Sequence, residues 1–228
     1  MAIAIIGGTV IHGTKDFAKA KMITVITPFG AVKMYRSGNI FMLPRHGIHH
    51  DIPPHMINHK ANIFALKKLG VIDVISICST GSLKKDIKPG TIAIPSDYMS
   101  LNSISTYYDK KIVHTVTGIN KHLMEGLIKS AKDLKIETKN NLIYVQTRGP
   151  RFETKAEINL FKDYGDIIGM TMASEADLCA ELKMDFAAIC SVDNYGNGIL
   201  KETFSFEEIR EKAKANSKDI LKIIDNIC

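Results

Sequence analysis

The 228-residue sequence lacks several patterns that would assign it to common classes of protein. Its four cysteines include no C-x-x-C pair, and three of them lie in apolar surroundings, which favours reduced core residues and a tail thiol. The apolar N-terminus, MAIAIIGGTVIHG, is too short and too soon interrupted by glycines for a signal peptide or a membrane span. These absences predict a cytoplasmic protein without membrane contact.

The sequence also lacks a basic stripe with interleaved aromatic residues, although its net charge is +6. The lysines alternate with acidic residues, as they do along residues 207–222. This pattern indicates a solvated surface rather than a nucleic-acid site, so RNA binding stays a distant alternative. The excess positive charge still favours a small anionic substrate.

Apolar runs that predict strands alternate with amphipathic runs that predict helices, without repeats or linkers. We therefore expect one α/β domain over residues 1–228, with three α/β/α layers and a central mixed, mostly parallel sheet. The first strand ends in GGT, but no G-x-G-x-x-G dinucleotide fingerprint follows. The expected strands are 2–6, 22–27, 31–35, 40–43, 71–77, 91–95, 142–147, 167–169 and 186–192. The expected helices are 53–69, 120–134, 154–164, one ending at 183, and a last one capped by Ser205 and Glu208.

Residues 41–62, FMLPRHGIHHDIPPHMINHKAN, hold five of the eight histidines. These histidines are His46, His49, His50, His55 and His59. A metal cluster is one interpretation, but Asp51 is the one carboxylate nearby, and a helix starting at the prolines puts only His55 and His59 on a shared face. Hydrogen-bonded or surface histidines are a second interpretation. An anion loop is the third, because arginine offers a fork of donors to a phosphate and His46 adds another donor.

Unusual polar residues and glycines follow six of the predicted strands. In a mostly parallel sheet, strand ends gather at one edge, where α/β proteins bind their ligands. The sequence therefore predicts one composite site. Its segments are Gly8-Thr9, Arg45-His46, residues 79–81, residues 149–153, Met170-Thr171 and residues 193–195.

Taken together, the motifs resemble those of the trimeric purine nucleoside phosphorylases and methylthioadenosine phosphorylases. The motifs are GGT, RHG at 45–47, GSL at 81–83, GPRFET at 149–154, and the MT that precedes Ser174-Glu175. The resemblance runs from residue 3 to about residue 221. It implies phosphorolysis of a purine nucleoside, with inorganic phosphate as co-substrate, no cofactor, no metal, and a homotrimer or homohexamer.

The resemblance also implies roles for individual residues. The phosphate site would comprise Thr9, Arg45, His46, Ser79 and Thr171. Met170 would lie at the ribose, Phe152 against the base, and Asp193 at purine N7, with His46 and Asp193 as the catalytic residues; a one-residue shift would put Asn194 at N7. The 5′ substituent would lie near Phe206, Ile209 and Ala213, with His114 contributed by a neighbouring subunit.

The residue after GPRF indicates which purine is bound. Within the resembled family this residue is typically serine in methylthioadenosine enzymes and glutamate in 6-oxopurine enzymes, and here it is Glu153. A carboxylate accepts the N1 hydrogen of a 6-oxopurine, while Asn194 and Tyr195 can donate to its carbonyl oxygen. We therefore expect 6-oxopurine nucleosides, namely 5′-methylthioinosine, inosine and guanosine, as substrates. Methylthioadenosine phosphorolysis is the alternative, and a histidine-cluster metalloprotein is a more distant one.

Overall fold

The structure is a computed structural model that describes residues 2–8, 20–101, 105–200 and 206–227. Within residues 206–212, only the side chains of Glu207 and Glu211 are described. The strands are β1 (Ala2–Gly7), β2 (Lys21–Thr27), β3 (Gly30–Ser37), β4 (Ile40–Pro44), β5 (Val71–Ser82), β6 (Ile92–Ser100), β7 (Thr138–Gln146), β8 (Ile167–Gly169) and β9 (Asp185–Tyr195). The helices are α1 (His59–Lys68), α2 (Lys121–Asp133), α3 (Lys155–Phe161), α4 (Met172–Glu181) and α5 (Phe206–Asp225), with a short 3-10 helix at Pro54–Met56.

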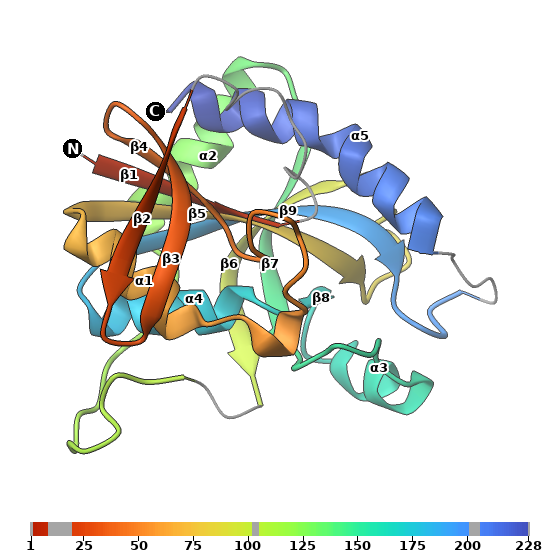
Figure 1. Ribbon diagram of the computed structural model, residues 1–228. Helices are drawn as coiled ribbons and strands as arrows, with labels where there is room; N and C mark the ends of the chain where they lie inside the picture. Colours follow the sequence, from red (N-terminus) through yellow and green to blue (C-terminus); the bar gives the residue numbers. More distant parts are fainter. Residues whose placement is uncertain (1, 9–19, 102–104, 201–205, 228) are drawn as a thin grey trace.

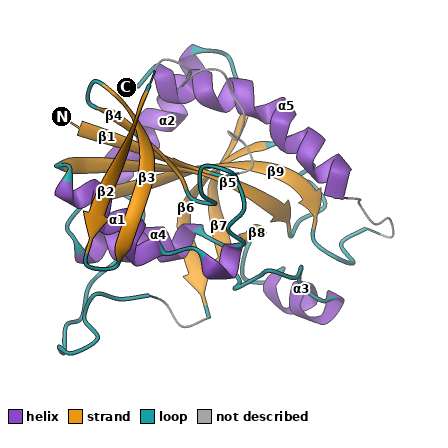
Figure 2. Cartoon of the chain, in the orientation of Figure 1, coloured by secondary structure: helices purple, strands orange, loops and turns teal. Residues whose placement is uncertain are grey.

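The strands form one nine-stranded sheet in the order β2-β3-β4-β1-β5-β8-β7-β6-β9. The sheet is mixed: β1 pairs in parallel with β4 and β5, whereas β2 and β3 form an antiparallel hairpin. Strand β5 also pairs in parallel with β9, so strands β5 to β9 close into a ring. Helices α2 and α5 cover one face of the sheet, and α1 and α4 cover the other (Figures 1 and 2). The expected three-layer α/β fold with a mixed sheet is confirmed.

Strands β5 and β9 are buried on both faces, which explains their nearly continuous apolar sequences. Because side chains alternate along a strand, Val74 and Cys78 join the core beneath α1 and α4, while Ile75 and Ile77 join the core beneath α2 and α5. The polar residues of β5 follow the same alternation. Ser76 therefore lies on the α1 and α4 face, in line with Cys78.

The structure corrects several expected boundaries. The helix predicted at 53–69 is wrong in its first part, because α1 begins at His59, where the Asn58 side chain accepts a hydrogen bond from the Ala61 amide. His55 lies instead in the short 3-10 helix, so it shares no helical face with His59. Strands β5, β6, β7 and β9 are each longer than expected. The capping box predicted for Ser205 and Glu208 lies outside the described residues.

The described residues contain no helix that is both long enough and apolar enough to cross a membrane.

Candidate active site

The end of β4 brings Arg45 and His46 beside the end of β1. The Arg45 amide donates to the Gly7 carbonyl at 2.8 Å, which continues the parallel pairing of the two strands. A Cβ atom at Gly8 would lie 3.1 Å from both Arg45 Nη1 and His46 Nε2. These two nitrogen atoms therefore border the same small space, which a larger residue at position 8 would fill. Gly8, the second glycine of the GGT motif, thus keeps this space open because it has no side chain.

Arg45 is 3% exposed, and its guanidinium is held by partners from two elements, α4 and β5. Its Nε and Nη2 donate to the two carboxylate oxygens of Glu175 in α4, at 2.7 and 2.9 Å. Nη1 donates to the Ile77 carbonyl at 2.7 Å, and Nη2 also donates to the Ser76 hydroxyl at 2.6 Å. Burial disfavours both charges, but each partner stabilises the other, so the pKa of Arg45 is raised and that of Glu175 is lowered. Arg45 is therefore a fixed cation that already has a counter-ion.

His46 is neutral and has one defined tautomer. Its Nδ1 lies 2.8 Å from the Ile52 carbonyl oxygen, which can only accept, so the ring hydrogen is on Nδ1. Burial, and then the Arg45 charge, lower the pKa of His46 to about 4. Nε2 is consequently an unprotonated acceptor at neutral pH. The predicted phosphate contact of His46 stays a prediction, and in the free protein its Nε2 atom carries a lone pair.

Thr171 lies on the same side of the sheet, at the start of α4. Its hydroxyl makes no hydrogen bond to the first turn of the helix and lies 4.0 Å from Cys78 Sγ. Cys78 Sγ is in turn 3.9 Å from Arg45 Nη2. The buried Tyr144 hydroxyl accepts the Thr171 amide at 3.3 Å and so fixes the beginning of α4. Arg45, His46 and Thr171, predicted to bind phosphate from distant segments, are thus brought together.

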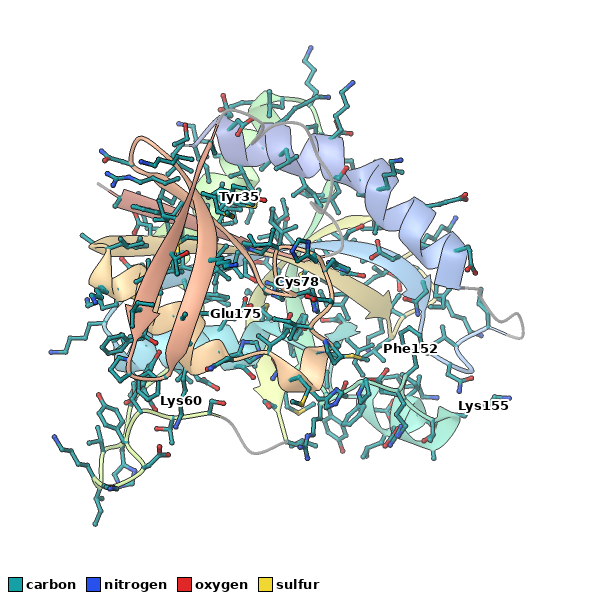
Figure 3. The ribbon with its side chains drawn as sticks, viewed as in Figure 1. Tyr35, Lys60, Cys78, Phe152, Lys155 and Glu175 are labelled. Carbon is teal, nitrogen blue, oxygen red and sulfur yellow. The ribbon has the colours of Figure 1, made fainter. Side chains whose placement is uncertain are left out.

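Three residues at the centre of this cluster, Ser76, Cys78 and Glu175, had no predicted role. Figure 3 shows Cys78 and Glu175 close to the middle of the molecule. The period-two alternation of β5 was a usable signal, since it puts Ser76 and Cys78 on one face. The acidic Glu175, which stands among apolar residues in the sequence of α4, was a second signal for a buried charge pair.

Ser79 lies next to Asp193 instead of joining the Arg45 cluster. The hydroxyls of Ser79 and Ser191 donate to the two oxygens of the Asp193 carboxylate, and Asn216 of α5 donates to Ser191 at 2.8 Å. Asp193 is 1% exposed, and burial raises its pKa to about 7 against the opposing effect of the two hydroxyl bonds. The Ser79 hydroxyl is therefore committed to Asp193 in the free protein, and its predicted phosphate contact stays a prediction.

A second group of predicted residues gathers around the loop that follows β7. Glu153 is 7% exposed, and the Thr147 hydroxyl donates to its Oε1 atom. Phe152 is 54% exposed and lies toward α3 in Figure 3. Gly149 has a φ of +64°, and a Cβ atom there would lie 2.5 Å from Met170 Sδ. The predicted base loop and the predicted ribose residue are thus in contact.

Asn194 and Tyr195, both at the end of β9, face different surroundings. Asn194 is partly exposed and lies beside Gly81, whose Cβ position would be 3.3 Å from the Asn194 amide nitrogen. The Tyr195 hydroxyl donates to the Lys85 carbonyl, in the loop after β5, at 3.2 Å. The predicted role of Tyr195 as a donor to the purine carbonyl stays a prediction.

The remaining predicted residues lie outside this cluster or outside the described residues. Thr9 is not among the described residues, and neither are the side chains of Phe206 and Ile209. Ala213 is fully buried in the core beneath α5. His114 is exposed on the segment 109–118, which belongs to the loop that projects at the lower left of Figure 1.

One interpretation of the histidine cluster was a metal site in the part of the chain that the structure describes. No group of three or more histidine, cysteine or acidic side chains there is arranged to hold a metal ion. His59 is buried with its Nδ1 atom 4.0 Å from Glu175, while the ring centres of His46 and His50 are 4.9 Å apart. His59 therefore lies beside Glu175, whereas His46 and His50 lie beside each other.

Comparisons with known proteins agree with the fold. A family model described as the phosphorylase superfamily matches residues 2–228. A solved structure of methylthioadenosine phosphorylase from Schistosoma mansoni, in complex with adenine, superposes with a TM-score of 0.87 at 24% identity and covers 100% of this chain and 90% of that one. At this identity the superposition supports the fold alone.

Relatives of higher identity cover nearly the whole chain. A protein of Archaeoglobus fulgidus named probable 6-oxopurine nucleoside phosphorylase is 39% identical, over 98% of this chain and 94% of its own. A protein of Methanocaldococcus jannaschii named probable S-methyl-5'-thioinosine phosphorylase is also 39% identical, over 98% of this chain and 90% of its own. A third, of Hyperthermus butylicus, named S-methyl-5'-thioadenosine phosphorylase, is 35% identical, over 97% and 85%.

The Arg45–Glu175 pair leads to a stability prediction. Glu175→Gln leaves a buried, unneutralised guanidinium, so the free energy of unfolding should fall by about 3–5 kcal/mol. Chemical denaturation measures this loss. Asp109→Asn, which removes the acid from the exposed Lys60–Asp109 pair, is the control and should cost less than about 1 kcal/mol. Equal losses in the two variants would contradict the importance of the buried pair.

Proposed function

Because the chain belongs to the phosphorylase superfamily, we propose that it catalyses phosphorolysis of 6-oxopurine nucleosides, with 5′-methylthioinosine, inosine and guanosine as substrates. The products are the free purine base and ribose 1-phosphate or its 5-methylthio analogue. Inorganic phosphate is the co-substrate, and the reaction uses no cofactor. The observation that carries the choice of purine is the buried carboxylate of Glu153 in the loop beside Met170.

Phosphate is the nucleophile in the proposed reaction. Displacement at a sugar carbon passes through an oxocarbenium-like state, so an oxyanion held beneath C1′ stabilises the developing positive charge and then bonds to that carbon. The C1′–N9 bond breaks, and its electron pair goes to the purine. The convergence of Arg45, His46 and Thr171 supports a phosphate site formed by these residues. The protein's task there is to position the anion.

The leaving purine needs a hydrogen-bond donor at N7, where its negative charge accumulates. Both oxygens of Asp193 already accept serine hydroxyls, and the residue is 1% exposed. Asn194 is partly exposed, and its amide donates without having to be protonated first. One of its two amide hydrogens bonds to the Tyr195 carbonyl at 2.8 Å, which leaves the second for N7. We therefore assign N7 to Asn194 and give Asp193 the task of fixing the end of β5 to β9 through Ser79.

Glu153 discriminates between the two purine classes. The Thr147 hydroxyl donates a hydrogen bond to its Oε1 atom. No described residue donates a hydrogen bond to Oε2. This second oxygen is therefore left to accept the N1 hydrogen of a 6-oxopurine. Adenine has a lone pair at N1 instead, so its N1 would face a carboxylate oxygen without a hydrogen between them. Such a mispaired polar edge in a buried site is costly.

The exposed segment 109–118 supports an oligomer. Ile112 and Val116 are 94% and 95% exposed, and His114 lies between them. Burying such residues against a second copy of the chain removes apolar surface from water and can place His114 at the neighbouring site. We propose a homotrimer or a pair of trimers. The free, buried thiols of Cys78, Cys179 and Cys190 support the proposed cytoplasmic location.

The proposed reaction is tested by following base release from inosine, 5′-methylthioinosine and 5′-methylthioadenosine, with and without phosphate. We expect hypoxanthine release that requires phosphate and yields a sugar 1-phosphate. Release in phosphate-free buffer would identify a nucleosidase, and a strong preference for methylthioadenosine would contradict the 6-oxopurine assignment. Salt-sensitive oligonucleotide binding would instead support the RNA alternative.

Replacing Glu153 by serine tests the choice of purine. Glu153→Ser removes the acceptor for N1–H, so kcat/KM for inosine should fall at least about a hundredfold relative to kcat/KM for methylthioadenosine. Glu137→Ser, at an exposed position before β7, is the control and should leave the ratio unchanged. Equal losses for both purine classes in Glu153→Ser would refute the assigned role.

The pH dependence separates Asn194 from Asp193 as the N7 donor. With Asn194 as donor, kcat/KM for inosine at saturating phosphate should change by less than about threefold between about pH 6 and pH 8, because an amide does not titrate. If Asp193, whose pKa is about 7, were the acid, kcat/KM would instead fall about tenfold per pH unit above that value. Asn194→Ala should lower kcat by about 10²-fold or more, whereas Asp193→Asn should not.

A further inference from the structure

Resting on the phosphate site of the proposed function, we propose that His46 determines oxyanion specificity: its Nε2 accepts the P–OH hydrogen of hydrogen phosphate and so selects phosphate over sulfate. The ligand class is a tetrahedral oxyanion that carries a hydrogen. Arsenate belongs to this class, and sulfate at neutral pH does not. His46 thereby acts as an acceptor in a site that is otherwise built from donors.

The tautomer of His46 follows from geometry. A backbone carbonyl has no hydrogen to give, so the 2.8 Å contact with Ile52 requires the hydrogen on Nδ1. Nε2 then carries a lone pair. The Gly8 geometry places Nε2 and Arg45 Nη1 at the edge of the same small space. An anion that contacts the arginine there also meets the histidine lone pair.

The charges around His46 keep it in this state. Arg45 faces it with a positive charge, and the adjacent His50 ring and the more distant Glu175 complete the titratable groups that influence it. Arg45 and Glu175 are already paired, so together they bring no net charge to the site. A bare oxygen anion facing Nε2 is therefore repelled by the lone pair without a surplus cation to offset the repulsion.

Hydrogen phosphate resolves this conflict because it carries one hydroxyl even as a dianion. Its P–O–H group donates to Nε2 and turns the repulsive contact into a hydrogen bond. The three remaining oxygens are unprotonated, so one of them is free to attack C1′ while the others accept from the donors of the site. The histidine thus orients the nucleophile as well as selecting it.

Calorimetric titration of the full-length enzyme with inorganic phosphate and with sodium sulfate tests the proposal. At about pH 8, phosphate should bind at least about tenfold more tightly than sulfate, the effect of one mispaired buried group. Lowering the pH toward the His46 pKa of about 4 should strengthen sulfate binding relative to phosphate binding, because Nε2 then becomes protonated and turns into a donor. This arm needs only the wild-type protein.

Two histidine variants complete the test. His46→Asn keeps a donor for the Ile52 carbonyl but has no atom at the Nε2 position, so the two affinities should come within about threefold. His50→Asn is the matched control; asparagine tolerates the positive φ of 57° at this position, and the preference for phosphate should remain.

Similar affinities for phosphate and sulfate at pH 8, or an unchanged preference in His46→Asn, would overturn the role of His46. Phosphate-dependent release of hypoxanthine would still stand in either case. Failure of wild-type protein to bind phosphate, together with base release that needs no phosphate, would overturn the proposed function itself.

Discussion

The buried ion pair between Arg45 and Glu175 is the interaction on which the site depends. It joins residues 130 positions apart, one just after β4 and the other in the first turns of α4. Ser76 bonds to both partners and attaches the pair to the central strand β5. Burying two charges costs solvation free energy, and only this complete set of hydrogen bonds makes the arrangement stable. The pair therefore fixes three separate segments in one geometry.

That pairing also determines how the site can recognise an anion. A free arginine would attract any oxyanion by its charge, but Arg45 already has a carboxylate partner. Discrimination then depends on where hydrogens lie on the ligand and on the protein. The tautomer of His46, fixed by the Ile52 carbonyl, determines the position of one such hydrogen.

Much of the fold and part of the site could be predicted from the sequence. The buried strands and the residues at their ends were predictable because apolar runs and glycine-rich turns are local signals. The partners of these residues were not, since the Arg45–Glu175 and Ser79–Asp193 contacts depend on how β5 lies against β4, α4 and β9. The start of α1 was misplaced because the prolines indicated an earlier helix start, whereas the helix begins after Asn58, whose side chain caps it.

The two ends of the proposed substrate complex are recognised by the same physical rule. Glu153 presents an acceptor to the purine edge, and His46 presents one to the phosphate. An acceptor in a buried site binds a group that carries a hydrogen and rejects an otherwise similar group that lacks one, because two lone pairs then face each other without water between them. A 6-oxopurine differs from adenine at N1 in this respect, and hydrogen phosphate differs from sulfate in the same way. Selectivity at both ends thus needs no difference in size or net charge between the competing ligands.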